Sequence, residues 1–172
     1  MKRYFLILGL TLLWAMFFLS SCSIRFNSTG GGTVDPRLQS ISIDNFLNEA
    51  PVVVPFLAQE LNQKMQDRFL NQSNLSLTSG SADIRISGTI RSYDLRPVAV
   101  TGNETASQNR LTIGVVIKFD NIVEPTDSWE KTFSRFVDFD ASEDITSVEP
   151  DLIEEIIDQI TQDVFTESVG KW

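Results

Sequence analysis

The sequence contains no histidine and only one cysteine in 172 residues. Histidine is the side chain that most often serves as a general base near neutral pH and as a zinc ligand, so the Ser-His and Cys-His pairs of common hydrolases are excluded. A lone cysteine provides neither a disulfide framework nor a thiolate metal cluster within one chain. We therefore expect a fold that is stabilised by a hydrophobic core, with no cofactor, no metal and no catalytic function.

Positive charge is also scarce, because 14 Lys and Arg residues face 23 Asp and Glu residues and the net charge is −9. Binding to nucleic acid depends on cationic side chains that neutralise phosphates, so this balance argues against DNA or RNA as a partner. It argues equally against attachment to anionic lipid through a basic patch. Attachment to a membrane would need another source.

The N-terminal residues have the features of an export signal. Lys2 and Arg3 precede an apolar run from Tyr4 to Leu19, and small residues then lead to Cys22. A lone membrane helix and an ordinary secretory signal are the alternatives, but the run is short for a span and lacks a stop-transfer flank. The segment resembles the lipobox of bacterial lipoproteins, whose cysteine is acylated and becomes the mature N-terminus. This resemblance implies lipidation at Cys22, with acyl chains such as palmitate as the membrane anchor.

The residues after Cys22 indicate a destination and a tether. Ser23 stands where an aspartate would resemble an inner-membrane retention signal, and no acidic run follows, so we expect an outer-membrane protein that faces the periplasm. A glycine-rich stretch over residues 28–33 predicts a flexible tether. The expected organisation is a cleaved signal peptide over 1–21, a lipidated N-terminus and tether over 22–37, and one α/β domain over 38–172.

Several segments alternate between apolar and polar residues, which predicts strands with one packed face. The pattern is short around Ile41 and Ile43, and it is long over residues 84–91 and 110–119. A less regular version runs from Trp129 to Val137.

Two further segments have helical periodicity. Leu57, Leu61, Met65 and Phe69 fall at four-residue steps and predict one apolar stripe on a helix over residues 56–72. Near the C-terminus we expect Ser147 to cap a second helix that begins through Pro150, since proline is tolerated in a first turn. Its predicted apolar stripe comprises Leu152, Ile153, Ile156, Ile157, Ile160, Val164 and Phe165.

The order of these elements predicts an α+β fold. A small, mostly antiparallel sheet with two helices packed on one face buries every apolar stripe in the simplest way. A signal peptide and a flexible tether would precede this domain.

Basic residues gather on the predicted strands, while residues 138–167 contain many acids and no Lys or Arg. If the apolar positions face the helices, these cations point to the opposite face of the sheet. One interpretation is a solvated face with ordinary charge pairing, and the other is a surface that docks on a partner or binds an anion. The candidate residues are Arg85, Arg91, Arg110 and Lys118.

The segment Val98 to Thr105 mixes apolar and small polar residues between two predicted strands. An exposed apolar loop would be a contact surface for a partner. Alternatively, Val98 and Val100 continue a strand and are buried. Both interpretations stay open at this point.

Five stretches of this chain, taken in order and at their spacing, resemble the Bacteroidota branch of LptE, a family of lipopolysaccharide-assembly lipoproteins. The resemblance covers nearly all of residues 22–172. The stretches that carry it are Ser40-Ile41-Ser42-Ile43 with Asn48-Glu49-Ala50-Pro51, Arg96 to Ala106, Asn109 to Ile113, Phe133 to Phe136 with Asp138-Phe139-Asp140, and Leu152 to Ile156.

The resemblance implies a non-catalytic protein that sits as a plug inside an LptD-like outer-membrane β-barrel, supports assembly of the barrel and helps lipopolysaccharide reach the outer leaflet. Only Cys22 is carried over as a family site. The alternatives are a free-standing periplasmic lipoprotein that binds a small ligand or another envelope complex, and an anchored hydrolase with a Ser-Lys or carboxylate-only site.

Overall fold

The computed structural model describes residues 35–98 and 107–169. The signal-like segment, Cys22, the glycine-rich tether and Val100 lie outside these residues. The elements are β1 (Ser40–Ile43), β2 (Leu47–Asn48), α2 (Leu57–Gln72), β3 (Ser76–Leu77), β4 (Ile84–Val98), β5 (Gln108–Asn121), the short 3-10 helix η1 (Pro125–Asp127), β6 (Trp129–Asp140) and α3 (Ile145–Val169).

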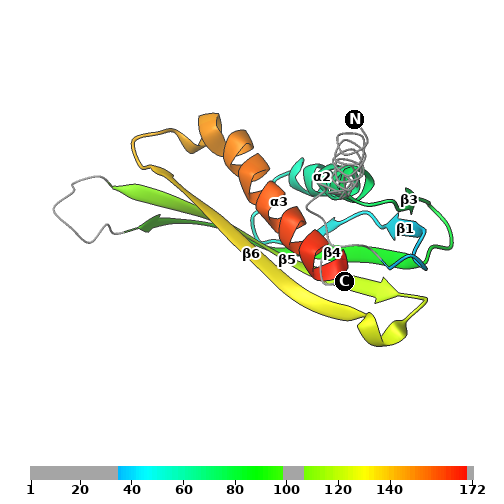
Figure 1. The fold of residues 1–172 in the computed structure, drawn as a ribbon. Coiled ribbons are helices and arrows are strands. Elements are labelled where there is room, and N and C mark those ends of the chain that lie inside the picture. Colours follow the sequence, from blue (N-terminus) through cyan, green and yellow to red (C-terminus); the bar gives the residue numbers. More distant parts are fainter. Residues whose placement is uncertain (1–34, 99–106, 170–172) are drawn as a thin grey trace, which may run out of the picture. The chain divides into compact units, whose positions relative to one another are not determined.

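The strands form one sheet in the order β3-β1-β4-β5-β6, and β2 also pairs with β4. The three long strands β4, β5 and β6 are antiparallel, whereas the short strands β1, β2 and β3 pair in parallel. Both helices lie on the same face of this sheet (Figure 1). The predicted α+β fold, with a mostly antiparallel sheet and two helices on one face, is confirmed.

The core lies between that sheet face and the helices. The alternating residues of β5 from Leu111 to Phe119 are buried, and so are Ile84, Ile86 and Ile90 of β4. The predicted stripes of both helices are buried as well. Complete burial of one such side chain contributes about 1.5–3 kcal/mol to the free energy of unfolding. The regularly spaced apolar residues of the strands and helices therefore stabilise this arrangement of layers.

Aromatic and polar contacts join α2 to α3. The rings of Phe69 and Phe165 meet edge to face, with centroids 5.2 Å apart. Arg68 donates to Thr161 Oγ1 at 3.1 Å and to Asp158 Oδ1 at 2.5 Å. These contacts fix the position of the helices relative to each other, so the apolar stripe of one helix is sealed by the other.

Charged residues explain the irregular alternation of β6. Lys131 and Arg135 occupy the helix-facing side of this edge strand, where an apolar residue would be expected. Lys131 binds Glu167, and Arg135 donates to both carboxylate oxygens of Asp163 at 2.6 and 2.9 Å. At the edge of a sheet a long side chain can reach past the core to a helix while its charge stays solvated.

The predicted start of the C-terminal helix is wrong. The helix begins at Ile145, five residues before Pro150, and Ser147 lies in its first turn. Asp144 caps it instead, because its Oδ1 accepts a hydrogen bond from the Thr146 N–H at 3.0 Å. Pro150 is therefore inside the helix, where it provides no N–H for the carbonyl one turn back.

A bulge between Ile90 and Ser92 shifts the register of β4. The extra residue is Arg91, and after it Tyr93 takes a helix-facing position and is 8% exposed. The Tyr93 hydroxyl donates to a carboxylate oxygen of Glu149 near the start of α3. Burial, and then this hydrogen bond, raises the pKa of the Tyr93 phenol well above its ordinary value of 10.0.

The raised pKa predicts a loss of stability at alkaline pH. Below about pH 10 the phenol is protonated in both the folded and the unfolded state, so Tyr93 adds no pH dependence. Above it, only the unfolded state releases the proton, and the free energy of unfolding falls as pH rises. Urea unfolding between pH 8 and 11.5 should show a steeper fall in the wild type than in Tyr93→Phe. Equal slopes would contradict the assignment.

Truncation of Phe69 should be costly because it empties the contact between the helices. Phe69→Ala should lower the free energy of unfolding by about 3–5 kcal/mol, as measured by urea titration. Leu70→Ala is the matched control, since Leu70 is the next residue on α2 and is 44% exposed. Its change should stay within about 0.5 kcal/mol; a comparable loss in both variants would disprove the packing argument.

Candidate partner-binding surface

The second face of the β4–β5–β6 sheet, the open face, is covered by no helix of the described chain (Figure 1). Its residues alternate with the buried ones and align across the strands by their register. Down the centre, Ser92, Gly114 and Ser134 share one row. Thr89, Val116 and Thr132 share the next. Apart from Val116, the middle of the open face is thus made of small and hydroxyl-bearing residues.

Gly114 makes this centre flat. A Cβ added there would lie 2.5 Å from Ser92 Oγ, closer than real Cβ contacts. The side chain of Ser92 therefore covers the space that a larger residue at position 114 would take. A flat, small-residue surface lets another sheet or chain approach the backbone closely.

Arg110 and Asp138 form the best-defined ion pair of the open face. The guanidinium donates from Nε and Nη2 to the two carboxylate oxygens, at 2.7 and 2.8 Å. It also lies 3.7 Å from the centre of the Phe136 ring. The hydrogen bond from Arg110 lowers the pKa of Asp138. The arrangement presents a cation over an aromatic ring, with Phe136 itself 48% exposed.

The other three candidate cations have different surroundings. Lys118 donates to Asp120 Oδ2 at 2.7 Å, and Arg91 pairs with Glu49, which follows β2. Arg85 lies opposite Asp120 in the strand register, and no ion pair of Arg85 occurs within the described residues.

Arg91 and Lys118 line one hollow of about 450 Å³ on this side of the sheet. Apolar walls come from Leu47 and Val116, while Asp44 and Glu130 add negative charge. Arg85 and Arg110 are not part of its lining. The structure thus brings two of the four candidate cations together and separates the other two along the sheet.

Val98 ends β4 and pairs with Gln108 of β5, and it is partly exposed. The strand continues through Val98, as one of the two interpretations expects, but the Val98 side chain is not buried as that interpretation also requires. Val100 belongs to the residues that the structure leaves undescribed, so the segment from there to Thr105 stays a prediction.

Sequence reasoning missed three contributors to this surface. Leu47 is 59% exposed beside the hollow, and Phe136 supports Arg110. Arg96 aligns with Arg110 across β4 and β5, which places two cations side by side. The alternation of β6 could have assigned Phe136 to the open face, but Leu47 gives no sequence signal because β2 has only two residues.

The described residues hold neither a metal-binding cluster nor a membrane-spanning helix. No group of three or more His, Cys, Asp or Glu residues there is arranged to hold a metal ion. None of the helices in the same residues is long and apolar enough to cross a membrane.

Comparison with solved structures supports the architecture. A minor lipoprotein from Acinetobacter baumannii superposes with a TM-score of 0.51 at 11% identity, over 76% of this chain and 92% of that one. A putative lipoprotein from Caulobacter crescentus gives 0.48 at 10% identity, over 73% and 86%. Identities this low establish a shared fold for the first and nothing about function.

Sequence comparison is more specific. No curated protein matches this chain. The family model described as LptE, lipopolysaccharide-assembly, matches residues 38–168, which include every described helix and strand except the last residue of α3. The chain belongs to the LptE family of lipopolysaccharide-assembly proteins.

Proposed function

We propose that this protein is a non-catalytic, lipid-anchored subunit of the outer membrane that enters an LptD-like β-barrel from the periplasm. There it supports assembly of the barrel and assists transport of lipopolysaccharide to the outer leaflet. The observation that carries the proposal is the open face, which spans three long strands and combines a flat centre with cations and exposed apolar residues in a member of the LptE family.

The anchor follows from the N-terminal sequence. Acyl chains on Cys22 hold the protein at the inner leaflet of the outer membrane, and stable attachment needs more than one such chain. The glycine-rich stretch at 28–33 leaves the domain free to reach a partner. Core packing begins at Leu38, which is buried, so the tether ends shortly before it.

The flat centre of the open face suits contact with the wall of a barrel. Gly114, Ser92 and Ser134 raise no bulky side chain, so a strand or loop of the partner can approach closely. The exposed rings and aliphatic chains at Phe136 and Leu47 supply apolar area on either side.

The cations of the open face can exchange partners at low cost. Lys118 and Arg91 are both more than half exposed in their present ion pairs, and exposed pairs stabilise a fold by about 0–1 kcal/mol. A carboxylate of the barrel or a phosphate of lipid A would therefore replace an intramolecular acid without a large penalty. Arginine suits phosphate best because its planar fork donates two parallel hydrogen bonds.

Reversal of charge on the open face should weaken the complex. Native, lipidated Arg85→Glu/Lys118→Glu, purified from detergent-solubilised envelopes, should recover about tenfold less of the barrel, equivalent to ~1.4 kcal/mol. Arg37→Glu is the control, since Arg37 is an exposed arginine that precedes β1 and lies outside the open face. Mass spectrometry of each eluate measures the ratio of barrel to bait.

Three results of that purification are informative. Recovery of an LptD-like barrel in near-equal amount with the wild type supports the proposal. Recovery of the protein alone, or with a different machine, refutes it and favours the free-standing periplasmic lipoprotein. Equal barrel recovery with wild type and the double variant shows that these cations do not contribute to the interface.

A bulky residue at the centre of the open face provides a test that does not involve charge. Ser134 is exposed on β6, so Ser134→Trp should fold normally, yet it should abolish most barrel recovery by preventing close approach. Glu155→Trp, on the exposed surface of α3, should leave recovery unchanged. If the two tryptophan variants behave alike, the open face is not the docking surface.

A further inference from the structure

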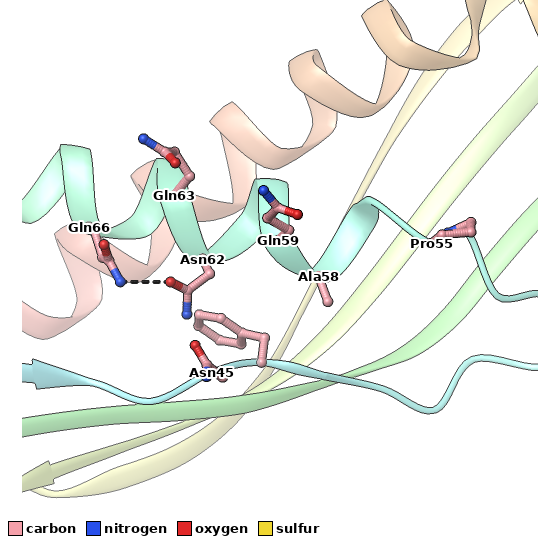
Figure 2. Close-up of a pocket in the computed structure, with 8 residues that line it drawn as sticks. Asn45, Pro55, Ala58, Gln59, Asn62, Gln63 and Gln66 are labelled. Atoms are coloured by element: carbon pink, nitrogen blue, oxygen red, sulfur yellow. Dashed lines mark hydrogen bonds between the residues drawn. The ribbon is translucent and has the colours of Figure 1, made fainter.

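A second hollow, of about 360 Å³, lies between α2 and the segment that joins β1 to β2 (Figure 2). Its volume is at the lower end of the range for pockets that hold small ligands. Asn45 lines both this hollow and the hollow on the open face. The two hollows are therefore neighbours at the segment that connects β1 to β2.

The hollow is lined by carboxamides. Gln59, Asn62, Gln63 and Gln66 follow the spacing of one helical face along α2 and line the hollow. Asn62 and Gln66 point toward Asn45 of the β1–β2 connection, which also lines it (Figure 2). No charged side chain contributes to the lining. Exposed helix faces normally carry charged residues, and the chain as a whole is 22% charged, so a neutral face made of amides is a specific feature.

Part of this amide set is fixed before any ligand arrives. Gln66 Nε2 donates to Asn62 Oδ1 at 2.6 Å, and Asn62 Nδ2 donates to the carbonyl of Asp44 at 3.1 Å. Among the described residues, the side chains of Gln59, Gln63 and Asn45 have no hydrogen-bond partner. The hollow thus combines an oriented Asn62–Gln66 pair with further lining amides whose donors and acceptors are available to a ligand.

Apolar groups complete the hollow. Phe46, Pro55 and Ala58 line it together with the amides, and the Phe46 side chain is itself packed into the core. A ligand that fits must present both hydrogen-bonding groups and a carbon surface of small size. The lining has no charged side chain that would pair with an ion, so it favours a neutral ligand.

We propose that this hollow binds a neutral saccharide. A carboxamide both donates and accepts hydrogen bonds, as a sugar hydroxyl does, and the C–H face of a pyranose ring matches the apolar part of the lining. An extended peptide fits less well, because the adjacent backbone is already engaged: the Asp44 N–H donates to Ile86 and its carbonyl accepts from Asn62. Two sources share this chemistry, namely a free glycan and the sugar part of lipopolysaccharide, and only the second rests on the proposed function.

The proposal can be tested by saturation-transfer difference NMR on the native, lipidated protein, which is kept in a detergent without sugar groups. The probes are N,N′-diacetylchitobiose, oligosaccharide released from lipopolysaccharide by deacylation and dephosphorylation, and a neutral tripeptide amide. Wild type should transfer saturation to the ring protons of at least one saccharide and not to the tripeptide. Gln59→Ala/Gln63→Ala should weaken the apparent affinity at least about tenfold, as expected for the loss of two hydrogen bonds.

Asn71→Ala/Gln72→Ala is the matched control, because these residues lie at the end of the same helix and outside the hollow. Unchanged saccharide binding in this control and loss in the first variant support the proposal. Transfer to neither saccharide, transfer to the tripeptide alone, or equal binding in both variants overturns it. Binding of chitobiose assigns the site to free glycans, and binding of the released oligosaccharide alone assigns it to lipopolysaccharide.

Failure of this proposal and failure of the proposed function are separable. Ser134→Trp lies on the opposite sheet face and should keep saccharide binding while it loses the barrel. Normal barrel recovery by the wild type, together with saturation transfer from the wild type to neither saccharide, would remove the hollow as a binding site and leave the proposed function intact.

Discussion

The packing of α3 across β5 is the constraint on which the rest of the structure depends. β5 is the central long strand, and its five alternating apolar residues from Leu111 to Phe119 are all buried on the helix side. Because side chains of a strand alternate with a period of two, the burial of one set fixes the other set on the opposite face. The open face is therefore a consequence of the core, and its residues are free to vary with function.

Electrostatics follows the same division. The acidic residues of α3 are met by cations that reach it from α2 and β6, in the pairs Glu154–Lys64, Asp158–Arg68, Asp163–Arg135 and Glu167–Lys131. These pairs hold separate elements together. On the open face, Lys118 pairs with Asp120 of the same strand, and Arg110 pairs with Asp138 of the neighbouring strand. A group on a binding partner can replace such a local acid without movement of any helix or strand. A docking surface needs this property.

Periodicity was sufficient to predict the strands, the two helical stripes and the layer arrangement, because each depends on the burial of regularly spaced apolar residues. It failed where a single local interaction decides the outcome. Ser147 and Asp144 are both good capping residues, and only the hydrogen bond from Thr146 selects Asp144. The bulge at Arg91 has no sequence signal, yet it determines that Tyr93 is buried. The candidate cations were placed on strands correctly, but their ion pairs depend on register, which alternation alone does not give.

The carboxamide hollow is a second feature that the sequence pattern alone does not predict. The amides of α2 are visible in the sequence as polar residues that lie away from the apolar stripe, and nothing in that pattern separates a solvated helix face from a binding site. The difference arises when the β1–β2 connection brings Asn45 and the Asp44 carbonyl opposite the helix, so that Asn62 is held in one orientation. That connection is short because β1 and β2 both pair with β4, and its length is thus set by the sheet. The neutral hollow and the hollow of the open face therefore depend on the same connecting segment, and Asn45 belongs to the lining of both.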